Sequence, residues 1–487
     1  MKNKVNEFNG YMTVYLSLIF TIILSLILAL IEGAAIGALR AQSELIADLG
    51  MDSAFAEYNR EILEQYDLLF VDTSYGDIYG GVGELREHIK DYMDYNMNPK
   101  KGIAIGDMST LLAVDALQLE IEEVSYACDD NGNVWKAHAI NYMKAVYGGD
   151  LISAVKNNIS TISENALDSC SIKDNVSEQK QAFEEALIQR NITEYSSESE
   201  EGYSYKKLSD TFDYVISEGI LSLLIPDGSK VSNRYIESNQ YLSKRKAAGK
   251  INKGSGLREG LDRPKHIDDE LIYGEYLLRK YGSYVNPKEN GKIGYQLEYI
   301  LSGENSDVSN LRAYASKLFA LRSASNFIYL SNDSFRHTEV SVVSTVICTI
   351  LGVPDMSDML TNIILGVWAM AEAVVDVRTI FNGGNVPLLK ENNSWKLSIS
   401  SLFTMDIFVT NDNSEGLDYE GYLRIFLGLM DKKEKVLRSL DIVEMDIRNA
   451  EGNETFRIDR CIDYMKVNFG FIDANGHDFV FSRSMCY

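Results

Sequence analysis

The sequence predicts an α+β protein. A transmembrane helix at the N-terminus is extended into a long helix, which leads into a large extracytoplasmic body of mixed helices and antiparallel sheet. Three observations predict this class. Residues 11–31 form one uninterrupted apolar run. Helical and alternating patterns then follow each other without the regular strand–helix rhythm of a parallel sheet. The chain closes with alternating stretches around Asn475-Gly476, a dipeptide typical of a β-hairpin turn.

The composition is that of a packed protein with an acidic surface. The chain has 487 residues, enough for more than one domain, with 45% hydrophobic and 24% charged residues. Its 71 acidic and 47 basic residues give a net charge of -24. Nucleic-acid binding depends on neutralising phosphates, so this charge argues against a general affinity for DNA or RNA. We therefore expect no nucleic-acid partner.

The segment 11–33 is expected to span the membrane. Its apolar run 11–31 holds no charge, Gly or Pro, and about 20 apolar residues suffice to cross a bilayer. Lys2 and Lys4 precede the span. The positive-inside rule therefore predicts a cytoplasmic head, residues 1–10, and a body outside the cell.

A cleaved signal peptide is the alternative, because Gly33-Ala34-Ala35 offers small residues for cleavage. Signal peptides usually have an apolar region of about 7–15 residues, so the longer run favours a retained anchor. Gly33, Gly37 and Ala41 repeat a small residue at every fourth position, a spacing that lets two helices approach closely. The simpler interpretation is that small residues are frequent in this stretch.

Residues 34–66 are predicted as a helical extension of the span. The part up to residue 49 is rich in helix formers, and we predict that Gly50 interrupts the helix. The second piece, 52–66, has apolar side chains at helical spacing. The apolar run 68–71 is predicted as a strand.

The first α+β lobe is predicted at 67–190. Its expected elements are a helix at 83–97, a strand at 117–126 and a helix at 135–147. The turn DDNGN after the strand has the acidic residues of a calcium loop. It lacks the Gly required at the sixth position of such a loop and the distal Glu, so we expect a plain turn.

Residues 191–265 are predicted as a polar and basic flexible linker region. Its second half carries a basic island in an acidic protein, including Lys244, Arg245, Lys246, Lys250 and Lys253. This island is either a contact loop for an acidic partner, an anionic lipid or a cell-wall polymer, or a solvated, flexible loop that is sensitive to proteases. The solvated loop is the simpler interpretation.

The C-terminal α+β lobe is predicted at 266–487. Residues 341–351 and 361–377 are apolar, but the first run is short and the second contains Glu372 and Asp376. We therefore predict a buried helical hairpin rather than further spans. The other expected elements are helices at 269–284, 294–301, 311–330 and 419–448, a strand or core segment at 395–409 and a terminal hairpin at 456–481.

Motifs that would mark an enzyme are mostly absent. The chain lacks the P-loop, zinc-protease and nucleophile-elbow motifs. Ser153 and Lys156 match S-x-x-K, but the companion motifs of penicillin-recognising enzymes are missing. The five Cys are too few for a disulfide framework and lack zinc-site spacing, although Cys461 and Cys486 could be bridged on paired strands. We expect no enzymatic activity, no cofactor and no metal.

The N-terminus resembles pilin-type anchors. A short basic head ends at Gly10, and the segment YMTV opens the apolar helix, as in type IV pilins and the TadE-like minor pilins of tight-adherence (Tad) systems. In those families a prepilin peptidase cuts after the Gly, so the resemblance implies cleavage between Gly10 and Tyr11. The families have a Glu at the fifth position beyond the cut, whereas this chain has Tyr15.

Nearly the whole chain is similar to a family of uncharacterised membrane proteins from clostridia and related Gram-positive bacteria, encoded near Tad-like pilus genes. The stretches that carry this similarity are GYMTVYLSLI, SAFAEYNREILEQYDLLFVD, LEYILSGENSDVSNL, VWAMAEAVVDVRTIFNGGNVPLLK and LDYEGYLRIFL. The similarity implies an association with a surface pilus or a secretion machine, and it implies no residue roles.

The sequence therefore favours a single-pass, pseudopilin-like membrane protein with an extracellular body. Its expected role is that of a structural or assembly component of a Tad-like pilus or secretion apparatus, and its expected partners are other apparatus proteins that contact the N-terminal helix. Two alternatives stay open. One is a surface adhesin or binding module, and the other is a membrane-tethered cell-wall hydrolase that uses Ser153 and Lys156.

Overall fold

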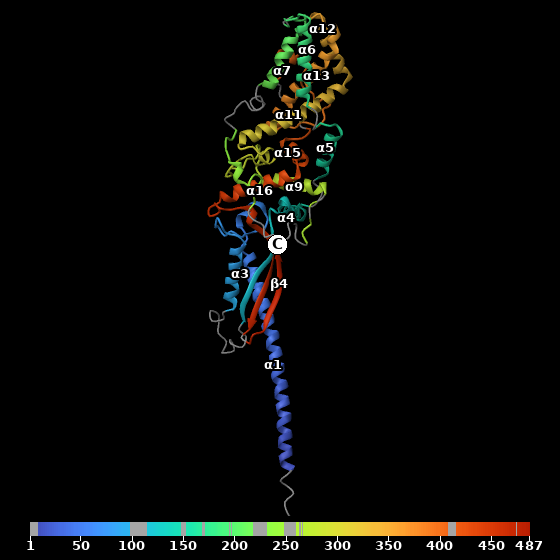
Figure 1. Ribbon diagram of the computed structural model, residues 1–487. Coiled ribbons are helices and arrows are strands. Elements are labelled where there is room, and N and C mark those ends of the chain that lie inside the picture. Colours follow the sequence, from blue (N-terminus) through green and yellow to red (C-terminus); the bar gives the residue numbers. More distant parts are fainter. Residues whose placement is uncertain are drawn as a thin grey trace, which may run out of the picture. The chain divides into compact units, whose positions relative to one another are not determined.

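The computed structural model shows a mostly helical protein with one antiparallel sheet, as the fold class predicted (Figure 1). It describes residues 8–97, 114–147, 152–167, 171–193, 195, 197–217, 231–247, 260–262, 264, 266–407, 415–473 and 475–487. The chain forms two compact units. The sheet unit consists of Met1–Asp130, Ala247–Leu261 and Ala450–Tyr487, and the helical unit consists of Asn131–Lys246 and Asp262–Asn449.

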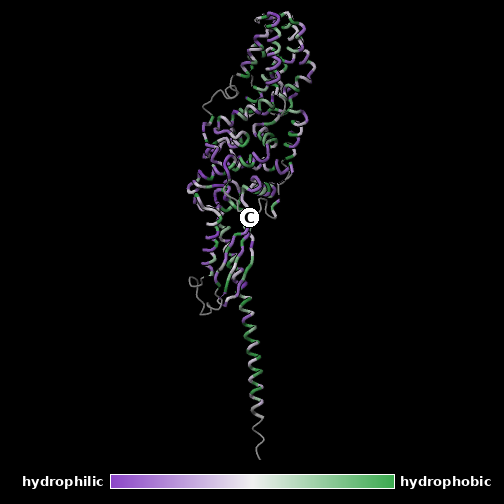
Figure 2. The backbone as a smooth tube through the Cα atoms, in the orientation of Figure 1, coloured by the Kyte–Doolittle hydropathy of each residue, from purple (hydrophilic) through white to green (hydrophobic). Residues whose placement is uncertain are grey.

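The first element of the sheet unit is the long helix α1, Phe8–Phe55. Its apolar first half is exposed, and Figure 2 shows this half as a continuous hydrophobic segment. The predicted interruption at Gly50 is wrong, because α1 continues for another five residues. Gly50 is buried against the helix α3, Val82–Met97, where a Cβ atom would lie 2.9 Å from Cγ of Met93. This glycine allows close helix packing rather than a helix end.

Among the described residues, four strands form the antiparallel sheet of this unit. They are β1, Val71–Asp72; β2, Val114–Tyr126; β3, Cys461–Asp473; and β4, Asp478–Cys486. The long strand β3 pairs with each of the other three. The register places Val124 opposite Met465 in β2–β3 and Phe469 opposite Phe481 in β3–β4. The β3–β4 pair confirms the predicted terminal hairpin.

The second half of α1 and the helix α3 share one hydrophobic core with the sheet. Ile46 and Met51 of α1, Ile89 of α3 and Phe469 of β3 are buried in it. Successive side chains of a strand point to opposite faces, so the sheet has one apolar face and one polar face. A short helix, α2, Arg60–Tyr66, lies between α1 and β1 in the chain. The predicted strand at 68–71 is paired only at its last residue, Val71.

The helical unit lies in the sequence between β2 and β3. Its helices are α4, Asp129–Tyr147; α5, Ser153–Glu164; α6, Ile172–Gln189; α7, Tyr205–Ser217; α9, Ile267–Lys280; α10, Gln296–Ser302; α11, Asp307–Asn332; α12, Ser334–Ile350; α13, Ser357–Phe381; α14, Ser401–Thr404; α15, Tyr419–Leu429; and α16, Lys432–Arg448. Helix α13 contacts α6, α7, α11 and α12. It is therefore the central helix of the group formed by α6, α7, α11 and α12 (Figure 1).

The predicted helical hairpin corresponds to α12 and α13. By length and composition α13 could cross a membrane, but 94% of its apolar stretch is buried within the unit. It is a core helix, as its two carboxylates indicated.

Three other expectations need correction. The segment 395–409 is expected to be a strand or a core segment. Its described part, 395–407, is a core segment with the short helix α14 rather than a strand, because Leu397, Leu402 and Phe403 are buried. The single helix predicted at 419–448 is two helices, because Asp431 caps the N-terminus of α16. The predicted linker 191–265 contains the helix α7, whose Tyr205 and Leu208 are almost fully buried. In each case packing against distant parts of the chain decides the local structure.

Candidate functional site

The exposed half of α1 has the chemistry of a membrane surface. None of the apolar stretch that begins at Tyr11 is buried by the described part of the chain. Within it, Ser17, Thr21 and Ser25 each donate a hydrogen bond to the carbonyl oxygen three residues earlier, at 2.8–2.9 Å. A bilayer offers no hydrogen-bond partners, so internally satisfied polar groups suit it. This helix is a membrane anchor or a signal sequence.

The residues of the predicted cleavage site lie at the start of this helix. Gly10 is part of α1, and Tyr11 is 84% exposed. Cleavage between them stays a prediction.

The small residues Gly33, Gly37 and Ala41 lie on the exposed side of α1. A Cβ atom added to Gly33 or Gly37 would meet nothing within 4 Å among the described residues. The backbone of α1 is therefore open to a partner at these positions, and their role in helix packing stays a prediction.

Polar contacts fix the second half of α1 to the sheet. Arg483 of β4 bonds to Glu44 at 2.9 Å and to Asp48 at 3.0 Å. The hydroxyl of Tyr487 donates to the carbonyl oxygen of Phe55. These contacts and the shared core join the exposed apolar half of α1 to a rigid base.

The basic island is only partly a surface feature. Arg245 is paired with the buried carboxylate of Glu444, and its Nε donates to the carbonyl oxygen of Gln240 at 3.1 Å. Lys244 is exposed and donates to Ser238 at 2.7 Å. Lys246 is exposed as well.

Two further residues of the predicted contact loop, Lys250 and Lys253, lie outside the described residues. Among the described residues, Arg245 thus has an internal structural partner. A contact role of the island stays a prediction.

The S-x-x-K match does not form a described catalytic pair. Lys156 is exposed and pairs with Asp268 at 3.0 Å. Ser153 is the exposed first residue of α5. Cys461 and Cys486 are free thiols, and the register pairs Cys486 with Tyr464 rather than with Cys461. No group of three metal-binding side chains occurs among the residues that the structure describes.

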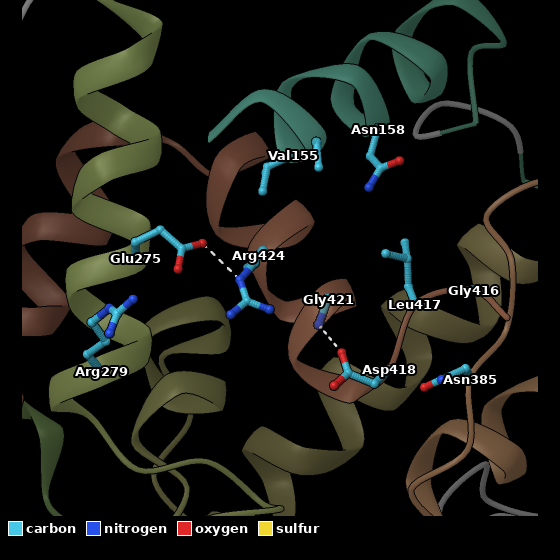
Figure 3. A pocket seen from close by; sticks show the side chains of 11 residues that line it. Val155, Asn158, Glu275, Arg279, Asn385, Gly416, Leu417, Asp418, Gly421 and Arg424 are labelled. Carbon is cyan, nitrogen blue, oxygen red and sulfur yellow. Dashed lines mark hydrogen bonds and ion pairs between the residues drawn. The ribbon is translucent and has the colours of Figure 1, made fainter. Parts of the chain in front are cut away.

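A cavity of about 470 Å³ opens between α5, α9 and α15 in the helical unit (Figure 3). Its lining includes apolar and charged side chains: Ala154, Val155, Asn158, Glu275, Arg279, Asn385, Gly416, Leu417, Asp418, Gly421 and Arg424. The volume lies within the range of small-molecule sites, which is roughly 300–1,000 Å³.

The sequence sets the walls of this cavity through two local features. Asp418 is the N-cap of α15, and its carboxylate accepts a hydrogen bond from the N–H of Gly421 at 2.8 Å. Gly428 lets α5 approach α15 closely, because a Cβ atom there would lie 2.4 Å from Cδ1 of Ile159. The charged wall comes from α9 and α15, where Glu275 binds Nε of Arg424 at 2.8 Å.

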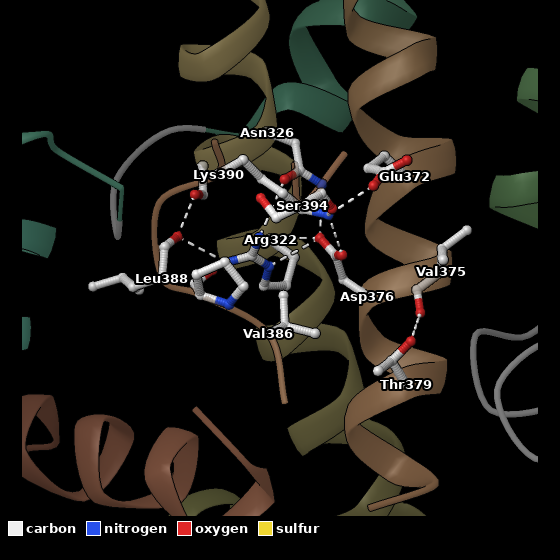
Figure 4. A network of polar contacts seen from close by, with 12 residues as sticks. Arg322, Asn326, Glu372, Val375, Asp376, Thr379, Val386, Leu388, Lys390 and Ser394 are labelled. Atoms are coloured by element: carbon white, nitrogen blue, oxygen red, sulfur yellow. Dashed lines mark hydrogen bonds and ion pairs between the residues drawn. The ribbon is translucent and has the colours of Figure 1, made fainter. Parts of the chain in front are cut away.

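A second polar cluster in the helical unit is fully buried (Figure 4). Lys390 lies 2.6 Å from Glu372 and 2.7 Å from Asp376. Arg322 bonds to Asp376 at 3.0 Å and to the carbonyl oxygens of Pro387 and Leu388 at 2.8 Å. Two cations and two carboxylates therefore tether the segment after α13 to α11 and α13.

The electrostatics of this cluster follow from burial and pairing. Burial raises the pKa of Glu372 despite the nearby Lys390. Burial also opposes ionisation of Asp376, but Arg322 and Lys390 outweigh it and hold the pKa of Asp376 below its usual value. Because its charges balance and its members join α11, α13 and the segment after α13, this cluster acts as a structural device.

Sequence reasoning missed the cavity and most of the buried cluster. The signal for the cluster was present, because Glu372 and Asp376 stand four residues apart in an apolar helix and buried carboxylates need cations. Their partners Arg322 and Lys390 lie on other segments, and only the tertiary structure identifies them. The cavity residues had no local signal, since they come from separate helices.

The comparisons with known proteins add one finding. The model of a family of unknown function, DUF5702, matches residues 197–472, which is more than half of the chain. The matched range includes α7 to α16 and almost all of β3, and it leaves α1 outside. No curated protein and no solved structure matches the chain.

Proposed function

The chain belongs to the DUF5702 family of unknown function, and we propose that it is a single-pass membrane protein that serves as a structural or assembly component of a Tad-like pilus or secretion apparatus. In this proposal α1 anchors the protein, the N-terminus is cytoplasmic and the acidic body lies outside. No catalytic activity is assigned to it.

The division of α1 into two halves carries this proposal. One half is apolar and uncovered over the length of a membrane span, and the other is packed into the core of the sheet unit. A single rigid element therefore links a membrane anchor to a folded domain. Such a link suits a component that must be aligned with neighbours, and it supports the pilin-type role that the residues around Gly10 suggest.

The orientation rests on the charges at the two ends of the span. Lys2 and Lys4 precede it, and Glu32 is the first charged residue after it. Positive charge is retained on the cytoplasmic side. The exposed face of α1 at Gly33, Gly37 and Ala41 is then the part nearest the membrane that a partner helix of the apparatus could contact.

A variant at this face tests the partner contact. Gly37→Leu places a bulky side chain where the backbone is open, whereas Ala38→Leu places the same side chain about 100° around the helix. We expect Gly37→Leu to abolish the cross-linking of the protein to apparatus components in native membranes and Ala38→Leu to preserve it. Equal cross-linking by both variants would contradict a role of this face.

N-terminal sequencing of the membrane-purified protein tests the class of component. A start at Tyr11 would mean that a prepilin peptidase accepts the chain, despite Tyr15, and would support a pilin-like subunit. An intact N-terminus would support a permanent anchor in an assembly platform. A start near Ile36 would mean that the body is released, and it would overturn the proposal.

A surface binding module is the second candidate, and the cavity of the helical unit is the observation that favours it. Deletion of the gene distinguishes the two functions. Loss of assembled apparatus supports the structural role, whereas intact apparatus with altered attachment supports the binding module.

A further inference from the structure

The cavity between α5, α9 and α15 contains an arginine that pairs with no carboxylate among the described residues. The guanidinium of Arg279 lies 4.0 Å from the ring centre of Tyr147, which holds it by a cation–π contact. No carboxylate pairs with it in the described part of the chain. Stacking on an aromatic face leaves the N–H groups in the plane of the guanidinium available to a ligand.

The second arginine of the cavity is positioned but not saturated. Glu275 binds Nε of Arg424 at 2.8 Å, and Glu420 lies 3.8 Å from its Nη2, beyond hydrogen-bonding distance. Figure 3 shows the end of this side chain between Glu275 and Asp418, with Arg279 on the same side of the cavity. The two arginines together offer planar donors of the kind that match a carboxylate.

The opposite sign of charge is also present. Asp418 is exposed, and one of its oxygens accepts the N–H of Gly421, so the other keeps its acceptor capacity. The four charged side chains of the lining are Arg279, Arg424, Glu275 and Asp418, and their charges balance. A lining of balanced charge favours a ligand that carries both signs over a dianion such as phosphate.

We propose that this cavity binds a small zwitterion, a short peptide with free termini, with its carboxylate between Arg279 and Arg424 and its ammonium group at Asp418. Val155 and Leu417 provide an apolar wall for the ligand's side chain. Asn158 projects into the opening from α5 and offers an amide to the ligand's polar backbone (Figure 3). This proposal is independent of the proposed role in an apparatus.

Calorimetric titration of the full-length protein in detergent tests the site with trialanine as the probe. We expect saturable binding of trialanine with free termini. We expect no saturation with the C-terminal amide, because the carboxylate is lost, and weaker binding of the N-acetylated peptide. These comparisons use the unmodified protein, so they do not depend on the folding of a variant.

A matched pair of variants locates the site. Arg279→Gln removes the unpaired guanidinium from an exposed position, and we expect it to weaken trialanine binding at least about tenfold, as for a lost hydrogen bond to a charged group. Arg312→Gln makes the same change at an exposed position of α11 outside the cavity lining and should leave binding unchanged.

Three results would overturn the proposal. They are the absence of saturable trialanine binding, equal binding of the amidated peptide, and unchanged affinity in Arg279→Gln. Tighter binding of inorganic phosphate than of trialanine would also overturn it, because it would show an anion site rather than a zwitterion site.

Discussion

Lys390 is a fully buried cation that holds two carboxylates of α13. Lys390→Met would remove a buried positive charge that neutralises Glu372 and Asp376. Removing one partner of a buried ion pair costs about 3–5 kcal/mol. We therefore expect a loss of this size in the free energy of unfolding, measured by urea denaturation of the protein in detergent. The exposed Lys433 of α16 serves as the control, since Lys433→Met should change stability by less than about 0.5 kcal/mol. Equal stability of the two variants would contradict a structural role of the cluster.

Glu298 of α10 is a second buried group with a measurable consequence. Burial raises its pKa to about 7, although Tyr419 donates to it at 2.6 Å. An unfolded Glu has a pKa near 4.3. Between about pH 4.3 and about pH 7, the folded protein therefore holds a proton on Glu298 that the unfolded protein has lost. The free energy of unfolding therefore falls as pH rises through this window. Burial raises the pKa of Asp441 to about 6 in the same direction.

The variant Glu298→Gln should remove the contribution of this one group. The free energy of unfolding of the variant minus that of the unmodified protein should increase by up to about 3 kcal/mol as pH rises from about 5 to about 8, because only the unmodified protein loses the contribution of Glu298. Glu304→Gln changes an exposed carboxylate nearby and is the control, with a nearly constant difference over the same range. A stability difference for Glu298→Gln that does not vary with pH would contradict the shifted pKa. Denaturant unfolding at several pH values provides the measurement.

In the proposed function, the two halves of α1 have different surroundings: the first half lies in the membrane and the second half packs on the sheet unit. Ile22 and Leu45 are both exposed apolar residues of this helix, at 64% and 58%. Only Ile22 lies within the predicted span. Ile22→Arg should cost about 2.5–3.5 kcal/mol of membrane insertion and shift the protein out of the membrane fraction.

The same substitution at Leu45 is the control, because this residue follows the span, and Leu45→Arg should remain in the membrane fraction. Alkaline extraction of membranes measures both variants. Retention of Ile22→Arg at the level of Leu45→Arg would show that α1 is not inserted as proposed.

The elements differ in how far the sequence could predict them. The apolar run at the start of α1 and the turn signal Asn475-Gly476 are local patterns, and the long N-terminal helix and the terminal hairpin that they predict are confirmed. The prediction that α13 is a core helix rather than a membrane span is also correct. It rested on Glu372 and Asp376, because unpaired carboxylates are costly to bury in lipid. Gly50 misled the prediction, since a glycine that ends a helix and a glycine that admits a neighbouring helix look alike in sequence.

At the scale of the whole molecule, long-range pairing limited the prediction. β2 and β3 are neighbours in the sheet although the entire helical unit lies between them in sequence. No local sequence pattern identifies β3 as the strand that pairs with β2. Bringing the two strands together also costs chain entropy, because a long stretch of chain separates them. The cavity was unpredictable for the same reason, because Arg279 and Arg424 come from separate helices.

The location of the body is the claim on which the proposed function depends most, and Cys486 provides a natural reporter for it. This thiol is exposed on β4 of the sheet unit. The measurement is labelling of intact cells with a membrane-impermeant maleimide. Comparison of the unmodified protein with Cys486→Ser identifies the reporter, and a thiol-bearing cytoplasmic protein of the same cells is the control for membrane integrity. We predict labelling at Cys486 before lysis and of the cytoplasmic protein only after lysis. Labelling of Cys486 only after lysis would place the body in the cytoplasm and contradict the account.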